Sequence, residues 1–186
     1  MLFASLSLVA LAAFANAAAV DVAKRQAASG AFCYAGVHEI EYNDQYGALE
    51  LATTCEALMG TDRSTMWSHR RCVAAAVAGT PNVFIDFANC GNNITIPLEK
   101  DFPSLDYNVY ASIVGNCAWA QGGCPITQQN FVDLVYSELA ATGSNIWPTS
   151  AQVLINDRIA PIFTWTNFTV AEGVPYLNFN DYLHYS

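Results

Sequence analysis

Two short segments carry residue types used in acid–base and electrostatic catalysis. His38 is followed by the carboxylates of Glu39 and Glu41, which suits a general acid–base pair if the segment is a strand. The run His69–Arg71 adds an imidazole and two guanidiniums, a set that can stabilise the charge of a phosphoryl transition state. A surface histidine and a solvated basic edge explain the same residues with fewer assumptions. A small hydrolase therefore stays an alternative hypothesis.

Other catalytic patterns are missing from the sequence. It contains no G-x-S-x-G turn for a serine nucleophile, and the glycine pair Gly122-Gly123 is too short for a phosphate cradle. His184 lies close to the C-terminus, where we expect a frayed surface position. We predict no catalytic residues and no cofactor, and an enzymatic role is uncertain and less favoured than binding.

Binding of a neutral sugar is easier to support. Sugars present flat apolar C–H faces ringed by hydroxyls, which aromatic rings and amide side chains can hold. Six residues in loop-like contexts have these properties and are the predicted ligand-binding set: Tyr34, Tyr42, Asn43, Trp67, Trp119 and Gln121. Each of the aromatic residues could instead belong to the core.

The cysteines indicate an oxidising compartment. The sequence has six of them, an even number, and they are Cys33, Cys55, Cys72, Cys90, Cys117 and Cys124. None forms the C-x-x-C pair typical of zinc or redox sites, so we predict three disulfides, no free thiol and no metal. The sequons at Asn93 and Asn167 are predicted glycosylation sites of a secreted glycoprotein.

The N-terminal segment predicts secretion. Residues 1–17 resemble a signal peptide that ends in A-N-A, and residues 18–25 form a short prosegment that ends at the dibasic Lys24-Arg25. Residues 26–186 would then be a single mature domain located outside the cell. No membrane contact is expected after signal removal, since the apolar run is too short to span a bilayer.

The net charge of the mature chain limits the classes of partner that we expect it to bind. Processing would remove Lys24 and Arg25 from seven basic residues and Asp21 from sixteen acidic ones, which leaves five and fifteen and a net charge of −10. Such a surface repels phosphate backbones and anionic lipid. We therefore expect no nucleic-acid partner and favour glycans or glycoproteins.

Three segments have helical signals. The first begins after Asn43 or Asp44, ends at Gly60, and repeats apolar residues at Ala48, Leu51, Ala52, Cys55, Leu58 and Met59. The second follows a cap at Ser104 and places Val109, Tyr110, Ile113, Val114 and Cys117 on one face. The third has Thr127 as its N-cap and Gly143 behind it.

A β-hairpin is predicted around Pro81. The apolar runs 72–78 and 83–90 flank the turn-forming residues 79–82, and neither face of the runs is polar. We interpret them as inner strands of a covered sheet, with Asp86 needing a partner. A helix through 72–78 is the alternative, since the run is rich in alanine.

The rest of the chain adds further predicted elements. An edge strand follows the loop 61–68, a short strand covers 94–96, a segment 151–160 ends at Pro161, and 162–170 alternates like a strand. The aromatic stretch 176–185 would cover a core edge or form an adhesive surface. These elements predict an α/β fold: an α/β/α sandwich with a mainly antiparallel sheet, helices on both faces and disulfide staples.

The order of these features resembles a known family. Cys33-Tyr34, the helix ending near Cys55, the step to Cys72 and the run from Tyr110 to Gly122-Gly123 are similar to the small secreted fungal (mushroom) lectins that have an α/β/α sandwich fold. The resemblance covers about half of the precursor. It implies a non-enzymatic glycan-binding protein, with a homodimer as one form. The C-terminal region 125–186 is longer than that family implies.

Two other readings stay open. Glutamate, histidine and arginine together are similar to the residue set of small secreted guanyl-type ribonucleases, in residue types alone. A secreted effector or cell-wall protein that binds a partner through residues 176–186 is the remaining hypothesis.

The pairing of the cysteines has two alternatives. Cys72 and Cys90 would face each other across the predicted hairpin. If Cys72 instead keeps a partner that the lectin resemblance implies, Cys33, Cys55 or Cys117, then Cys90–Cys124 follows, and we prefer this second arrangement.

Overall fold

The computed structural model describes residues 29–90 and 102–186, and over these ranges the chain is helical with no strand. One isolated antiparallel bridge joins Ile126 and Val174. The predicted α/β/α sandwich with its antiparallel sheet is therefore wrong. The predicted signal peptide, prosegment, strand 94–96 and sequon at Asn93 lie outside the described residues.

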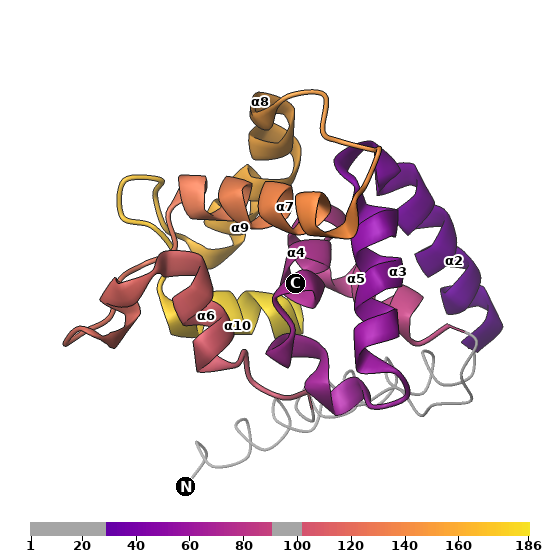
Figure 1. Ribbon diagram of the computed structural model, residues 1–186, viewed down its shortest axis with the longest axis horizontal. Coiled ribbons are helices and arrows are strands. Elements are labelled where there is room, and N and C mark those ends of the chain that lie inside the picture. The colour runs from indigo at the N-terminus through magenta and orange to yellow at the C-terminus, as the bar shows by residue number, and fades with distance from the viewer. Residues whose placement is uncertain (1–28, 91–101) are drawn as a thin grey trace, which may run out of the picture.

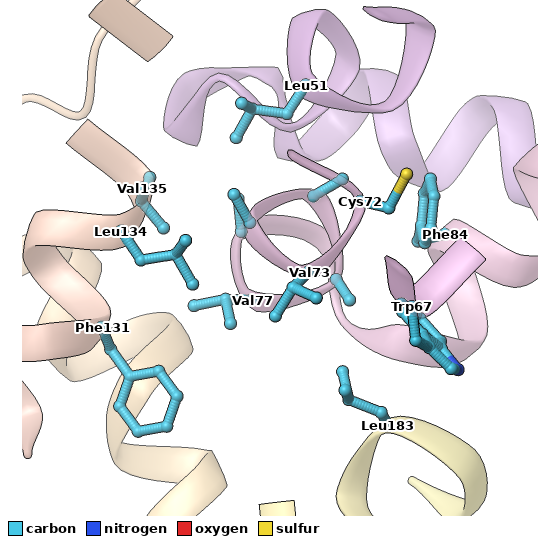
Figure 2. Packing of buried hydrophobic residues seen from close by; sticks show 14 of the residues in the cluster. Leu51, Trp67, Cys72, Val73, Val77, Phe84, Phe131, Leu134, Val135 and Leu183 are labelled. Atoms are coloured by element: carbon cyan, nitrogen blue, oxygen red, sulfur yellow. The ribbon is translucent and has the colours of Figure 1, made fainter. Parts of the chain in front are cut away.

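Helix α4 (Arg70–Gly79) is the centre of the fold. Every residue from Cys72 to Gly79 is buried, so the helix has no solvent face beyond its first two residues. Seen along its axis, α4 is surrounded by side chains of its neighbours, including Leu51, Phe84, Leu134 and Leu183 (Figure 2). A helix that is apolar all round belongs inside a protein, and the small side chains of its alanines let those neighbours approach closely.

The predicted hairpin is a pair of helices. Helix α4 ends at Gly79, and α5 (Pro81–Ala88) begins with Pro81 in its first turn, where proline lacks only an N–H that would have no helical partner. Thr80 separates them with φ +82°, a backbone conformation that breaks the helix. The apolar runs have no polar face, so their sequence could not distinguish a buried strand from a buried helix. The alternative helix through 72–78 is the one that the structure contains.

Helix α3 packs on α4, and α2 packs on α5 and α3. Helices α2 (Ser29–Tyr42) and α3 (Ala48–Met59) lie side by side at the indigo end of the chain, joined by the 3-10 turn η1 (Asn43–Tyr46) (Figure 1). A Cβ on Gly36 of α2 would lie 2.8 Å from the backbone nitrogen of Phe87 on α5, so glycine permits this close crossing. The predicted helix that ends at Gly60 is confirmed, but it begins at Ala48 after Gly47 and has no Asn43 or Asp44 cap.

The elements on either side of α4 and α5 agree with the sequence only in part. The predicted loop and edge strand after Thr61 are the 3-10 helix η2 (Arg63–Ser68) and the start of α4. Helix α6 (Tyr107–Val114) is capped by Asp106 and not by Ser104. Helix α7 (Gln128–Thr142) has both predicted ends, with a Thr127 capping box and Gly143 in the left-handed conformation.

The C-terminal third differs most from its predicted elements. Helix α8 (Ala151–Leu154), the π-helical segment η5 (Ile155–Ile159) and α9 (Ala160–Thr166) form one continuous run, so Pro161 does not end a segment and 162–170 is not a strand. Pro161 lies in the first turn of α9. The aromatic stretch is helix α10 (Tyr176–Tyr185), whose Phe179, Tyr182 and Leu183 are in the core.

Three disulfides join these elements, as the even number of cysteines predicts. Cys72 is bonded to Cys55, one of the three partners allowed by the preferred arrangement, but Cys90 is not bonded to Cys124. Cys33 on α2 is bonded to Cys90 after α5, Cys55 on α3 to Cys72 on α4, and Cys117 to Cys124 in the loop after α6. The predicted Cys72–Cys90 and Cys90–Cys124 bridges are both wrong. Helix geometry is the reason, since the hairpin that would have placed Cys72 opposite Cys90 does not exist.

The disulfides fit an extracellular protein. Among the described helices, none combines the length and the apolar character that a membrane span requires.

Candidate functional site

Four aromatic rings gather where α6, α10 and the Cys117–Cys124 loop meet. We call Tyr107, Tyr110, Trp119 and Tyr176 the aromatic cluster. The ring of Tyr107 is central: its centroid lies 5.0 Å from that of Trp119 and 5.2 Å from those of Tyr110 and Tyr176, with tilted or edge-on geometry in each pair. Edge-to-face contacts at these distances stabilise the rings beyond the area they bury.

The tyrosine hydroxyls anchor the loop to the helices. Tyr107 donates to the carbonyl of Ala118 at 2.7 Å, and Tyr110 donates to the carbonyl of Cys124. Burial raises the pKa of Tyr110, so its hydroxyl stays a donor through the neutral range. With the Cys117–Cys124 disulfide, these bonds fix both ends of the loop.

Tyr176 anchors the cluster from the other side. Its hydroxyl donates to the carbonyl of Leu105 at 2.5 Å, and its ring lies 5.0 Å from Tyr110. Burial, followed by the nearby carboxylate of Asp106, raises the pKa of the Tyr176 hydroxyl. The start of α10 is thereby joined to the start of α6.

Trp119 is the exposed member of the cluster. Its side chain is 63% exposed although its ring packs edge-on against Tyr107. Gln121 lies two residues further along the same loop and is also exposed. The loop, which the disulfide and the tyrosine hydroxyls hold, therefore presents an exposed indole and an exposed amide two residues apart.

The structure separates the other predicted ligand-binding residues. Tyr42 is 74% exposed, but it ends α2, which packs on α5 and α3 and not on the aromatic cluster. Trp67 is fully buried against Phe84. The side chain of Tyr34 lies outside the described part of the chain.

Asn43 is also unavailable as a ligand contact. It is buried, donates to the carbonyl of Gly79 and accepts from Arg158. Arg158 in turn lies 4.5 Å over the ring of Tyr46. Among the predicted residues whose side chains the structure describes, Trp119 and Gln121 are the two that lie exposed on the same loop.

The predicted histidines lie apart. His38 is on an exposed face of α2, which is a helix and not a strand, whereas His69 lies in a groove formed by the starts of α4 and α6 with α3 and α7. His38 is not among the residues that line this groove. The combined Glu, His and Arg set that suggested a ribonuclease is therefore not assembled around these two histidines.

We expected His184 at a frayed surface because it lies close to the C-terminus, and this prediction is wrong. Its ring is buried, and its two nitrogens contact the carbonyls of Asn180 and Pro103 at 2.6 Å and 3.0 Å. This histidine joins the end of α10 to the segment before α6.

In residues 29–90 and 102–186, no group of three or more His, Cys, Asp or Glu side chains has the arrangement of a metal site.

The sequon residue Asn167 ends α9 in the left-handed conformation and is exposed.

Sequence reasoning missed the support for Trp119. Tyr107 and Tyr110 are three residues apart on one helix, a spacing that could have revealed a shared aromatic face. Tyr176 carries no such signal, because its neighbours in space are distant in sequence.

No known protein family, curated protein or solved structure that was compared with the chain matches it. Its function must therefore be inferred from the residues themselves.

Proposed function

We propose that this protein is a secreted, non-enzymatic glycan-binding protein and that Trp119 is its sugar platform. The observation that carries the proposal is the exposed indole of Trp119 held edge-on against Tyr107. A flat apolar ring that is ordered before binding loses little conformational entropy when a pyranose stacks on it. The amide of Gln121 supplies a donor and an acceptor for the hydroxyls around the sugar.

The charge of the chain favours neutral glycans. A mature net charge of −10, counted after removal of two basic and one acidic residue, would repel sialylated or sulfated chains. The proposal does not depend on the mushroom-lectin resemblance, because the sandwich fold that this resemblance implied is absent from the described residues.

A partner-binding aromatic tail has less support. The stretch 176–185 places Phe179, Tyr182 and Leu183 in the core, so deleting it would expose the interior and not merely remove a docking segment.

The experiment is a glycan array with the oxidised, mature protein, followed by titration of the best neutral glycan. Replacing Trp119 by Ala should weaken binding by at least about tenfold, equivalent to about 1.4 kcal/mol. Trp165→Ala is the matched control, because Trp165 is 43% exposed and packs against a tyrosine, Tyr182, at 5.6 Å. Silence across fucosylated, galactosylated and N-acetylhexosamine-bearing glycans, or equal losses in both variants, would contradict the proposal.

A further inference from the structure

A second surface of this acidic protein contains two of its arginines. Four arginines lie in the described residues. Arg63 is buried beside Glu56 at 3.2 Å, and Arg158 stacks over Tyr46. The other two, Arg70 and Arg71, open α4 and line the groove that also contains His69.

The groove is open and has a volume of about 630 Å³. Its walls come from α3, α4, α6 and α7, and they carry mainly hydrogen-bonding side chains. Besides the two arginines and His69, the lining includes Ser68, Asp106, Asn108, Ser112 and Glu138. This surface is distinct from the aromatic cluster in the residues that form it.

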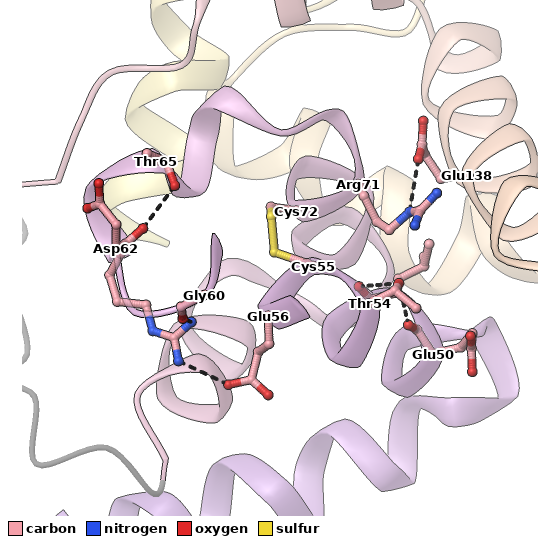
Figure 3. The surroundings of a disulfide bond; sticks show 12 residues. Glu50, Thr54, Cys55, Glu56, Gly60, Asp62, Thr65, Arg71, Cys72 and Glu138 are labelled. Atoms are coloured by element: carbon pink, nitrogen blue, oxygen red, sulfur yellow. Dashed lines mark hydrogen bonds and ion pairs between the residues drawn. A yellow bond between two sulfur atoms is a disulfide. The ribbon is translucent and has the colours of Figure 1, made fainter. Parts of the chain in front are cut away.

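A single carboxylate serves both arginines. Arg70 Nη1 lies 2.6 Å from Glu138 Oε1, and Arg71 Nε lies 3.3 Å from Glu138 Oε2 (Figure 3 shows the second pair). Glu138 is largely buried, with its side chain 12% exposed, whereas those of Arg70 and Arg71 are 28% and 20% exposed. Two cations therefore share one anion at the edge of the groove.

The second acid in the groove is already engaged. Asp106 caps α6, and its Oδ1 accepts from the backbone nitrogens of Asn108 and Val109 at 2.7 Å and 3.3 Å. These amides stabilise its charge and orient it toward the helix. Asp106 Oδ1 and both oxygens of Glu138 are thus occupied as acceptors, and the two carboxylates balance the charge of the two arginines.

The arginines of the groove have N–H groups that are not used in hydrogen bonds within the described part of the chain. Within the described part of the chain, Arg71 uses only its Nε in hydrogen bonds, and Arg70 Nη1 alone serves Ser137 and Glu138. A guanidinium has five N–H donors in a fixed fork that matches the two oxygens of a carboxylate or phosphate. The unused Nη groups of these partly exposed arginines can therefore donate hydrogen bonds to a second anion.

We propose that the groove binds a small ligand through its oxyanion group, with Arg71 as the principal contact and Arg70 as its neighbour. The shared chemistry is that of a phosphate ester or a carboxylate. Ser68 and Ser112 lie in the lining to contact the rest of the ligand. This is a second site beside the neutral-sugar platform, and the two do not depend on each other.

The test is an NMR titration of the oxidised, mature protein with inorganic phosphate and, separately, with acetate, at constant ionic strength. Saturable shifts should appear in the amides of residues 68–71, 106–112 and 138 with at least one anion. Tighter binding of phosphate would assign a phosphate ester, and tighter binding of acetate would assign a carboxylate. Sodium chloride in the same range is the control for general charge effects.

Two variants should act in opposite directions. Arg71→Gln should weaken binding of the anion by at least about tenfold, since it removes a charge-assisted bidentate contact. Glu138→Gln keeps the shape but removes the competing carboxylate, so binding should tighten by about threefold or more. Arg158→Gln, outside the groove, should leave binding unchanged.

Several results would overturn the site. These are no saturable shift with either anion, shifts spread over the whole surface, or equal weakening by Arg71→Gln and Arg158→Gln. If Arg71→Gln does not fold, Glu138→Gln decides, and weaker binding in that folded variant rejects the proposal. Loss of sugar binding by Trp119→Ala would affect none of these outcomes.

Discussion

Cys72 on the central helix is bonded to Cys55 on α3, with their Cα atoms 5.0 Å apart and both side chains fully buried. The bridge ties the first turn of α4, next to Arg71 of the groove, to α3 (Figure 3). Closing a loop of 17 residues stabilises a fold by about 3 kcal/mol, chiefly by restricting the unfolded chain.

The double variant Cys55→Ala/Cys72→Ala should accordingly lose about 3 kcal/mol of unfolding free energy, measured by urea denaturation. The corresponding double serine variant should lose about 1–3 kcal/mol more, because it buries hydroxyls that the site does not satisfy. Equal stability of the alanine variant and the oxidised wild type would show that this bridge does not form.

Removal of the Cys117–Cys124 bridge should lower both the stability of the protein and its affinity for glycans. It closes a loop of only 7 residues, so replacing both cysteines by alanine should cost about 2 kcal/mol. The same change frees the loop that carries Trp119, and we expect glycan affinity to fall by about tenfold or more, since ordering returns as a cost of binding. In contrast, Cys55→Ala/Cys72→Ala should keep its glycan affinity below its melting temperature.

Replacing Thr80 by glycine should stabilise the fold. It has φ +82° and ψ 145°, a region that a β-branched residue enters only with strain. Thr80→Gly should raise the free energy of unfolding by about 1 kcal/mol after the entropy of glycine is counted. The matched change on α3, exposed Thr53→Gly, should instead lower it by about 0.5 kcal/mol, and a loss at both positions would argue against this linker geometry.

The buried hydroxyl of Tyr182 should make the stability of the protein depend on pH in the alkaline range. Burial raises the pKa of its hydroxyl to about 12. Because the folded state holds this proton more strongly than the unfolded chain does, the stability it confers is complete below about pH 10, the ordinary tyrosine pKa, and is lost as pH rises toward 12.

The measurable effect is a loss of about 2–3 kcal/mol from Tyr182 across that window. Tyr182→Phe should remove this component, so its unfolding free energy should fall less between pH 10 and 12 than that of the wild type. The control is Tyr42→Phe, since Tyr42 is 74% exposed. Parallel pH profiles for wild type and Tyr182→Phe would contradict the assignment.

Local sequence signals determined several elements of this protein. Thr127 and Gly143 define α7 because capping chemistry depends only on residues within one turn of each helix end. Spaced apolar residues and Gly60 define α3 for the same reason. The even number of cysteines was sufficient to predict three bridges.

Tertiary structure decided what depends on neighbours distant in sequence. The uniformly apolar run in α4 has no polar face from which a period could be read, so the surrounding helices determine its conformation. Cysteine partners follow from helix packing, which is why Cys72 meets Cys55 and not Cys90. Burial likewise separates Trp67 from Trp119, two residues of one type, because only the packed fold decides which indole other side chains cover.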